Sequence, residues 1–481
     1  MKVLIILILF SSFISANAQT LPKIEREFRA VWIATVDNID FPTKKTLSIA
    51  EQKAEIISDL ELTKSLKMNA VIFQVRPMAD AVYESKIEPW SEFLTGEMGK
   101  SQPFDPLKFI IEEAHKRGIL VHAWFNPYRA YHPAAKTVSE NHISKRRPDL
   151  VRQYGKYMWL DPTDTEVQKY SLSVVLDVVK RYDIDGVHFD DYFYPYAEKD
   201  EKGNKIEFPD NANYKKYVQT ALNANKNRGI KRSPIEKDTW RRRHVNNFVA
   251  SVGQEIKKIK PTVMYGISPI GVQEINYNEL FADAEFWLSE GMIDYFVPQL
   301  YWKSDRKNRE FPILLKNWES KNVKKRHVWA GIGTYKIPSK TENFSADEII
   351  KQISYTREIQ KTAGNIQFSF KSVRSDFDKI QTALKEKSYK SEAIIPASPW
   401  IKTIKILAPK VAIKRDKDFV RVNWTEQGKQ KAFWFVVCAK DSNGWSYSIL
   451  PASQKSISLS AERKIEKIIV KSVDRLGNES K

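Results

Sequence analysis

The feature that most constrains the fold is a repeated order of segments: a short apolar strand, a polar or aromatic loop, and an amphipathic helix. Eight strands that alternate with helices predict an α/β fold in which a parallel sheet closes into a (β/α)8 TIM barrel. Strands are expected at 28–35, 70–75, 119–125, 264–268, 295–301, 327–332 and 366–370, and the fourth opens the stretch 185–194. Helices are expected at 49–66, 106–117, 165–181, 239–258, 280–290, 309–320, 346–362 and 376–387.

An open, doubly wound parallel sheet is the alternative fold. In such a sheet a glycine-rich turn after the first strand holds the phosphates of a nucleotide. The corresponding turn here is Val36-Asp37-Asn38, which contains no glycine. The barrel is therefore favoured, and its domain is expected to span residues 26–388.

Two segments depart from the barrel pattern. Residues 198–232 are polar and rich in Asn and Lys, and we expect an excursion over the top of the barrel rather than a separate domain. Residues 388–399 contain Ser, Pro and Ala and mark a domain boundary. Beyond it, short strands without helices predict a β-sandwich over 400–481 that resembles a fibronectin type III module. These strands are expected at 411–413, 419–424, 432–439, 446–450, 456–459 and 465–472.

Residues 1–18 have the pattern of a secretory signal peptide. Lys2 is followed by an unbroken apolar run over 3–10, and Ala16-Asn17-Ala18 is a small-residue cleavage site. The apolar run is too short to span a bilayer, and no second long apolar stretch follows. We therefore expect an exported protein, periplasmic or extracellular, that is not membrane-spanning.

The charge balance favours an anionic partner. Lys plus Arg number 78 against 59 Asp plus Glu, which gives a formal net charge of +19. Such a balance favours nucleic acid, anionic lipid or an acidic polysaccharide, and export argues against nucleic acid. The single cysteine, Cys438, lies in an apolar run and is expected to be a buried thiol rather than a nucleophile or a ligand.

The stretch 185–194, with the sequence DGVHFDDYFY, contains the strongest candidate for a reactive group. Alternate side chains of a strand point to opposite faces, so His188 and Asp190 share one face. Asp190 and Asp191 then fall where the strand ends in an aromatic loop. Carboxylates ringed by aromatic side chains suit chemistry on sugars. Capping of the next element, or pairing with Arg or Lys, is the alternative.

The carboxyl ends of the other expected strands are also polar or aromatic. In a (β/α)8 barrel these ends meet on one face, where the active site is built. Indole and phenol rings stack on the C–H faces of sugars, although core filling is the alternative for each Trp taken singly. The expected substrate-binding residues are Trp32, Gln74, Arg76, His122, Trp124, Asn126, His188, Tyr192, Ser268, Gln299, Tyr301, Trp302 and Lys371.

Five motifs resemble the glycosyl-hydrolase-like 10 family of exported bacterial proteins: FRAVW at 28–32, FQVR at 73–76, HAWFN at 122–126, DGVHFDDY at 185–192 and PQLYW at 298–302. The resemblance extends over about residues 26–388. It implies a TIM-barrel glycosidase that cleaves peptidoglycan glycan strands stripped of their stem peptides. Such strands bear free lactyl carboxylates, which suits a basic chain. The fourth motif is also similar to the D-G-x-R-x-D motif of the α-amylase superfamily, which implies that Asp190 is the nucleophile and that His188 replaces the Arg.

Glycoside cleavage normally requires two carboxyl groups, one that attacks or activates water and one that protonates the leaving oxygen. Asp190 is the candidate for the first role. Amylase-like enzymes take the acid from the fifth strand, but Gly266-Ile267-Ser268-Pro269 offers none. Glu274, on the following loop, is the nearest candidate, and Asp191 and Asp305 compete with it.

The sequence therefore predicts an exported glycoside hydrolase that acts on a polysaccharide of the bacterial cell wall. A non-catalytic glycan-binding envelope protein with the same aromatic groove is the alternative, because the fifth strand lacks an acid. A metal-dependent deacetylase or hydrolase is a third possibility. Neither a metal nor another cofactor is expected, since His122 and His188 lack the H-x-H or H-E-x-x-H spacing of metal sites.

Overall fold

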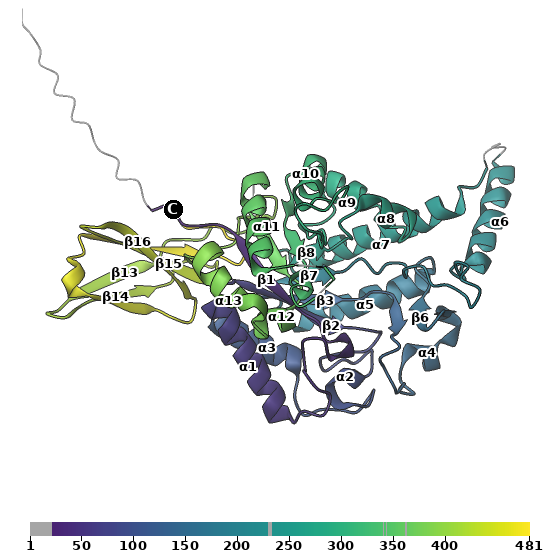
Figure 1. Cartoon of the computed structure of the whole chain (residues 1–481), viewed down its shortest axis with the longest axis horizontal. Helices are drawn as coiled ribbons and strands as arrows, with labels where there is room; N and C mark the ends of the chain where they lie inside the picture. Colours follow the sequence, from purple (N-terminus) through teal and green to yellow (C-terminus); the bar gives the residue numbers. More distant parts are fainter. Residues whose placement is uncertain (1–21, 229–232, 340, 343, 361–362) are drawn as a thin grey trace, which may run out of the picture.

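The computed structural model describes residues 22–228, 233–339, 341–342, 344–360 and 363–481, and the predicted signal peptide lies outside these residues. Within them, nine parallel strands form one sheet in the order β10-β9-β8-β7-β3-β2-β1-β12-β11 (Figure 1). The strands are β1 Phe28–Ile33, β2 Ala70–Arg76, β3 Leu120–Phe125, β7 Gly186–Phe189, β8 Met264–Ile267, β9 Tyr295–Phe296, β10 His327–Val328, β11 Ala330–Ile332 and β12 Gly364–Gln367.

The two ends of this sheet meet, so it is a closed barrel. β10 and β11 are separated only by Trp329 and represent the seventh expected strand, broken in two. The backbone of Gly331 in β11 accepts a hydrogen bond from Leu300 (3.0 Å) and donates one to Pro298 (2.9 Å), which joins β11 to the chain after β9. The prediction of a (β/α)8 barrel is therefore confirmed.

Helices cover the outside of the barrel, and local signals set their ends. The Ser48 hydroxyl and the Glu51 side chain form a reciprocal capping box at the start of α1, and Asp105 caps α3 ahead of Pro106. The main helices are α1 Ile49–Ser65, α3 Pro106–Lys116, α5 Thr165–Arg181, α7 Lys237–Ile259, α9 Ala284–Glu290, α10 Phe311–Lys321 and α11 Ala346–Ile359. In the described residues, no helix combines the length and apolar character that a membrane span requires.

The sequence-based boundaries differ from the structure in three places. A short helix that was not expected, α8 Gln273–Asn278, follows β8, and α9 begins only at Ala284 because Asp283 caps it. The last strand is shifted toward the N-terminus because α12, Phe370–Arg374, begins where the strand was expected to end. The helix expected at 376–387 is divided into shorter turns, among them α13 Ile380–Ala383.

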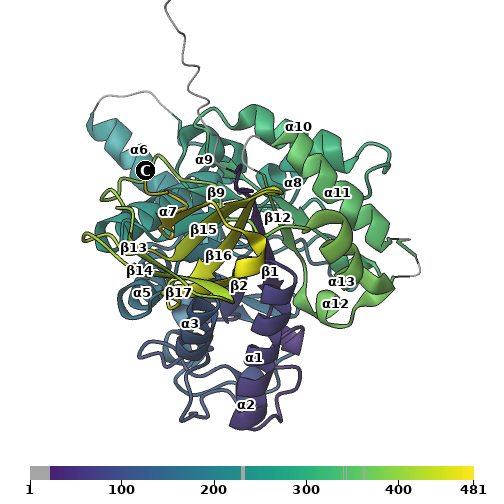
Figure 2. The same ribbon diagram turned by 90° about the vertical axis from the view of Figure 1, so that its left-hand side faces the viewer.

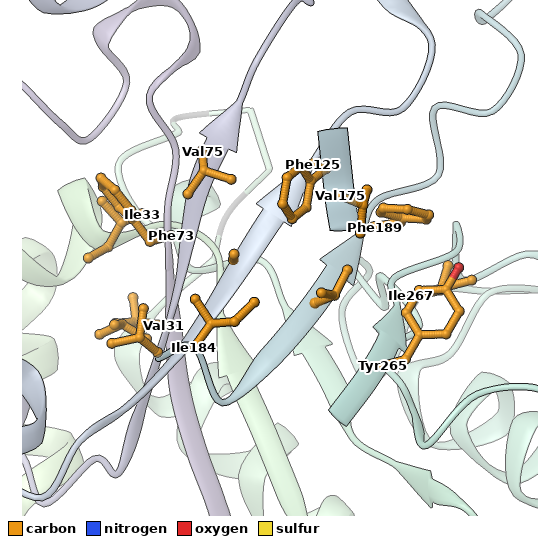
Figure 3. Packing of buried hydrophobic residues seen from close by; sticks show 14 of the residues in the cluster. Val31, Ile33, Phe73, Val75, Phe125, Val175, Ile184, Phe189, Tyr265 and Ile267 are labelled. Carbon is orange, nitrogen blue, oxygen red and sulfur yellow. The ribbon is translucent and has the colours of Figure 1, made fainter. Parts of the chain in front are cut away.

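The two faces of the barrel strands have different partners. Outer side chains such as Val31 and Phe73 form one apolar cluster with the surrounding helices, and Figure 3 shows Val175 of α5 beside Phe189 of β7. Inner side chains form a second cluster that continues into the C-terminal sandwich at residues such as Trp434 and Cys438. A Cβ added at Gly266 would lie 2.0 Å from the Tyr295 ring, so the barrel interior alternates glycine with large rings.

Loops at the carboxyl ends of the strands contain their own structure. The loop after β3 forms a small antiparallel sheet of β4 Arg129–Tyr131, β5 Val151–Tyr154 and β6 Tyr157–Leu160. The loop after β7 contains α6 Asn211–Asn227, which has no buried side chain and stands out at the end of the molecule opposite the sandwich (Figure 1). In the described part of the polar insertion, α6 is the one helix.

The C-terminal residues form the predicted β-sandwich. One antiparallel sheet has the order β13-β14-β17 and the other the order β16-β15-β18 in the described chain. Figure 2 shows β15 and β16 in front of the barrel. The strands are β13 Lys410–Arg415, β14 Phe419–Thr425, β15 Trp434–Asp441, β16 Gly444–Pro451, β17 Ser456–Ser460 and β18 Lys467–Val473.

The sandwich packs on the amino ends of the barrel strands, opposite the carboxyl ends. The Trp434 indole is buried and donates a hydrogen bond to the carbonyl oxygen of Gly118, just before β3 (2.8 Å). Arg475 forms ion pairs with Asp183 (2.6 Å) and Asp185 (3.3 Å), which precede β7. Asp185 thus lies at the bottom of the barrel, in the structural position that its place before the strand predicts.

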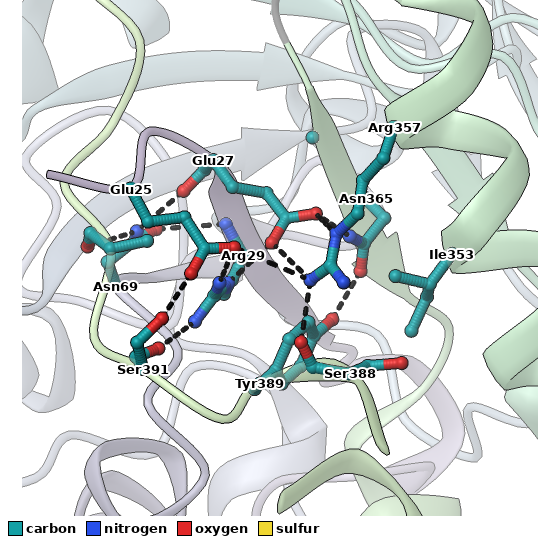
Figure 4. A network of polar contacts seen from close by, with 12 residues as sticks. Glu25, Glu27, Arg29, Asn69, Ile353, Arg357, Asn365, Ser388, Tyr389 and Ser391 are labelled. Atoms are coloured by element: carbon teal, nitrogen blue, oxygen red, sulfur yellow. Dashed lines mark hydrogen bonds and ion pairs between the residues drawn. The ribbon is translucent and has the colours of Figure 1, made fainter. Parts of the chain in front are cut away.

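A second polar network closes the bottom of the barrel at the junction of β1 and β12. The buried Glu27 carboxylate binds Arg29 (2.6 Å) and Arg357 (2.8 Å), as Figure 4 shows. Arg29 also donates to the carbonyl of Ser391 (2.7 Å), in the segment that leaves the barrel for the sandwich. Charged groups buried here have oppositely charged partners, which is the arrangement that burial of charge requires.

The contact at Trp434 predicts that barrel and sandwich stabilise each other. Trp434→Ala should lower the free energy of unfolding by about 3 kcal/mol, because it removes a buried indole and leaves the Gly118 carbonyl unpaired. Trp434→Phe should cost less, since a ring still fills the contact. Denaturant unfolding followed by circular dichroism measures both. An unchanged midpoint for Trp434→Ala would contradict this view of the interface.

Candidate active site

β7 delivers two consecutive carboxyl groups to the open end of the barrel. β7 pairs in parallel with β3 and β8, so that His188 lies beside Trp124 and Gly266. The chain leaves the sheet after Phe189, and Asp190 and Asp191 follow directly. Both line a cavity of about 330 Å³ at the carboxyl ends of the strands. Among the described residues that line it, these two are the only acids.

Aromatic rings form much of the cavity wall. Phe368 stacks on Tyr301 (centroids 5.8 Å apart) and meets the edge of Trp32, while Tyr192 and Tyr196 stand edge to face across the acids. Rings arranged in this way offer flat apolar faces beside polar groups. The lining residues are Trp32, Ala34, Val36, Ile39, Gln74, Trp124, Arg129, His132, Asp190, Asp191, Tyr192, Tyr196, Ser268, Gln299, Tyr301, Tyr335 and Phe368.

Each acid is held by neutral hydrogen-bond donors. Oδ2 of Asp190 accepts hydrogen bonds from the indole N–H of Trp124 (3.1 Å) and from the side-chain amide of Asn126. Asp191 accepts the hydroxyl of Tyr196 on Oδ2 and the Gln299 amide on Oδ1 (2.9 Å). The two carboxyl groups therefore have fixed orientations, Asp190 toward β3 and Asp191 toward the segment that follows β9.

The environment keeps a proton on this pair. Burial, and after it the negative charge of Asp191, raise the pKa of Asp190 to about 7. Burial also raises the pKa of Asp191, although its hydrogen bonds from Tyr196 and Gln299 oppose the increase. An acid whose pKa lies near 7 is present in both its neutral and its ionised form at neutral pH. The pair can therefore offer both an acid and a base.

A chain of hydrogen bonds beneath the cavity orients its floor. The Trp32 indole donates to Nε2 of His188 (3.2 Å), and the Ser268 hydroxyl lies 3.0 Å from the same nitrogen. The imidazole proton must then lie on Nδ1, which faces the Tyr295 hydroxyl (3.2 Å), and that hydroxyl in turn faces Nδ1 of His122 (2.7 Å). Burial holds the pKa of both histidines below the usual range, so both rings are neutral. They position the Trp32 ring and do not line the cavity.

A second layer supports Asp190 from the side of β2. The Gln74 amide donates to Oδ1 of Asn126 (2.6 Å), and Asn126 in turn donates to Asp190. Arg76 is fully buried, forms an ion pair with Glu88, and donates to the backbone carbonyl of Asn126 (2.6 Å). Arg76 was expected to bind substrate, but its guanidinium has no access to the cavity. It fixes the backbone that presents the amide.

Four other candidates lie away from the acid pair. Glu274 is exposed on α8 and lines a separate hollow with Tyr277 and Asp283, so the structure does not bring it to Asp190. Asp305 is 72 % exposed beside Lys303. Trp302 and Lys371, expected at the strand ends, also lie outside the cavity lining. Of the carboxyl groups considered as partner to Asp190, Asp191 alone shares its cavity.

The structure also adds residues to the site that the sequence did not indicate. Arg129 follows Asn126 by only three positions, but it lies in the loop after β3, beyond the strand end that drew attention. Tyr196 belongs to the aromatic run after Asp191, so the sequence pattern could have indicated it. His132 and Tyr335 come from longer loops. No group of three or more His, Cys, Asp or Glu in the described chain is arranged to hold a metal ion.

A closed (β/α)8 barrel whose strand ends place two buried acids in an aromatic-walled cavity defines a carbohydrate-cleaving enzyme, a glycoside hydrolase. The model of the glycosyl hydrolase-like 10 family matches residues 27–369, and the chain belongs to this family. The resemblance in the five motifs is thus confirmed over nearly the whole barrel.

Two relatives named as glycosyl hydrolases agree with this assignment. The chain is 37 % identical to the glycosyl hydrolase YngK of Bacillus subtilis, over 97 % of this chain and 93 % of that protein. It is 34 % identical to the glycosyl hydrolase DigH of Escherichia coli K12, over 73 % of this chain and 84 % of that protein. Among solved structures, the glycoside hydrolase domain of PgaB (BpsB) from Bordetella bronchiseptica aligns with a TM-score of 0.47 at 12 % identity, over 77 % of this chain and all of that domain.

The raised pKa of Asp190 predicts that its charge opposes folding. A carboxyl group with a raised pKa in the folded state stabilises the fold fully below its unfolded pKa, near 4, and that contribution is lost as pH rises through about 7. Asp190→Asn cannot ionise, so it should exceed the wild type in free energy of unfolding by about 2 kcal/mol at pH 8 and by little at pH 4.5.

Urea unfolding at these two pH values measures the effect. Asp305→Asn is the matched control, because Asp305 is exposed, and it should show no such pH-dependent difference. Equal stability of the wild type and Asp190→Asn at both pH values would contradict the burial of an ionisable Asp190.

Proposed function

We propose that the chain is exported and hydrolyses glycosidic bonds in peptidoglycan glycan strands that lack stem peptides, with Asp190 and Asp191 as its two catalytic carboxyl groups. The observation that supports this best is the pair itself: two acids with raised pKa values in an aromatic-walled cavity at the strand ends. The signal-like first 18 residues support export, and the net charge of +19 suits a polymer that bears carboxylates.

The pair can supply both functions that the reaction needs. The protonated carboxyl group gives its proton to the glycosidic oxygen, while the ionised one attacks the anomeric carbon or removes a proton from the attacking water. The C–O bond breaks, and water supplies the hydroxyl of the new reducing end and the proton that restores the pair. The proton belongs to the coupled pair, so either residue can begin as the acid.

We assign the nucleophile or base role to Asp190 and the acid role to Asp191. Two N–H donors, from Trp124 and Asn126, meet on one oxygen of Asp190 and stabilise its negative charge. Asp191 is then the remaining carboxyl group in the cavity that can protonate the leaving oxygen. The reaction requires the sugar to be held in the cavity. Aromatic rings of the cavity wall, such as Trp32 and Tyr301, can stack on its C–H faces.

Substitution of either acid should abolish cleavage while the fold survives. Asp190→Asn and Asp191→Asn should each lower the release of reducing ends from peptide-free glycan by roughly 1000-fold or more, because each removes one half of the acid–base pair. Glu274→Gln is the matched control and should keep wild-type activity, since Glu274 lies outside the cavity. Mass spectrometry of the products in ¹⁸O water should show one ¹⁸O at each new reducing end.

The two acids should separate on an activated substrate. An aryl glycoside with a good leaving group needs little protonation, so Asp191→Asn should recover much of its activity on it and Asp190→Asn should not. Normal cleavage by Asp190→Asn would refute the assignment of this site. Retention of the polymer with no new reducing ends would indicate a glycan-binding role instead.

A further inference from the structure

We propose that Arg129 binds the free lactyl carboxylate of the glycan, and that this contact makes the enzyme prefer strands without stem peptides. The inference rests on the proposed function and adds a residue that determines specificity. Arg129 differs from the other buried arginines of the described chain in its partners.

Four arginines of the described chain are buried: Arg29, Arg76, Arg129 and Arg241. Three of them are paired with a buried carboxylate: Arg29 with Glu27 (2.6 Å), Arg76 with Glu88, and Arg241 with Asp210 (2.7 Å). Arg129, which is 5 % exposed, has no ion pair among the described residues. A buried cation without an anionic partner is costly, unless a partner arrives from outside.

The hydrogen bonds of Arg129 leave part of the guanidinium available. Nε donates to the backbone carbonyl of Pro77 (2.9 Å) and Nη2 donates to Oδ1 of Asn126 (2.9 Å). Both acceptors are neutral. No hydrogen bond of Nη1 to another described residue is found, although the side chain lines the cavity. A guanidinium has five N–H donors in a planar fork, a shape that matches a carboxylate.

The surroundings place this cation where a bound sugar would be. The guanidinium lies over the Tyr192 ring, 5.2 Å from its centroid, and Tyr192 also lines the cavity. Arg129 lowers the pKa of both Asp190 and Asp191, so its charge is felt at the reacting pair, although it contacts neither as an ion pair. It is therefore close enough to bind a substituent of the sugar that occupies the cavity.

The rim above Arg129 is uncharged or positive. His132 lines the same cavity, and burial, with the charges of Arg129 and Lys156, lowers its pKa to about 4, so the ring is neutral at neutral pH. Lys156 lies between β5 and β6 of the small sheet that also contains Arg129, and its ammonium group lies over the Tyr157 ring. The positive charges of Arg129 and Lys156 both act on His132, so a positive potential reaches this part of the cavity lining. This side of the cavity thus favours a negatively charged substituent.

The chemistry of the proposed substrate supplies such a group. The lactyl ether of the muramic sugar ends in a carboxylate when no peptide is attached, and in a neutral amide when a peptide is attached. Charge-assisted hydrogen bonds to a guanidinium are roughly twice as strong as neutral ones. A guanidinium at this position therefore discriminates between stripped and peptide-bearing strands by charge.

Arg129 also supports Asn126, which holds Asp190, so loss of activity in a variant would not by itself identify its role. The decisive quantity is a ratio of two substrates on the same enzyme. One substrate is peptide-free glycan with free lactyl carboxylates, and the other is the same glycan with these groups converted to methylamides. Wild type should prefer the carboxylate form in kcat/KM by roughly 10- to 100-fold.

Arg129→Met should reduce this preference to within about threefold, whatever it does to the absolute rate, and Arg129→Lys should keep part of it. The matched control is Arg147→Met, which removes an exposed arginine that pairs with Asp149 and Glu166 outside the cavity and should keep the wild-type ratio. A ratio near one for the wild type, or an intact preference in Arg129→Met, would overturn the inference.

A binding measurement separates this inference from the proposed function. In an Asp190→Asn background, calorimetry should show tighter binding of the carboxylate glycan than of the methylamide glycan, and a second substitution, Arg129→Met, should remove the difference. If the wild type cleaves neither glycan, the proposed function fails, and the binding arm still decides on Arg129. Equal binding of both glycans by Asp190→Asn would reject the carboxylate contact, whether or not cleavage occurs.

Discussion

Two consecutive acids held out of water are the constraint around which the site is arranged. Asp190 and Asp191 are 5 % and 3 % exposed, and a carboxylate at such burial is costly unless donors surround it. The donors come from several strands: Trp124 and Asn126 at the end of β3, and Gln299 after β9. Arg129 adds a positive charge nearby. The acids therefore depend on strands on both sides of β7, because their supports come from β3 on one side and from the segment after β9 on the other.

Beneath this pair, the neutral His188 stands at the position that corresponds to the arginine of the α-amylase motif. The pKa of His188 lies well below the usual range, and its ring accepts a hydrogen bond from the Trp32 indole and faces the Tyr295 hydroxyl rather than an acid. Glycine at Gly266 makes room for the Tyr295 ring. The raised pKa of Asp190 thus comes from burial and from the charge of Asp191. The buried His188 imidazole thus links the side chains packed inside the barrel to the Trp32 ring in the cavity wall.

The sequence predicted the barrel, the sandwich and the acid pair because each follows from a local pattern: strand–helix alternation, strands without helices, and a polar strand end. It could not tell which polar residues face the cavity. Arg76 and Arg129 both lie near strand ends. Arg76 is buried in an ion pair with Glu88, whereas Arg129 lines the cavity. The partners that decide this are distant in sequence. For the same reason, Glu274 is close to the site along the chain, but α8 places it in a separate hollow.

The place where the sandwich attaches has a consequence for how the enzyme meets a polymer. Trp434 and Arg475 fix the module to residues just before β3 and β7, strands of six and four residues, so the barrel keeps it roughly 15–20 Å from the acids. The module cannot clamp the sugar being cut. If the module rests on a surface, the mouth of the barrel faces away from that surface at a fixed distance.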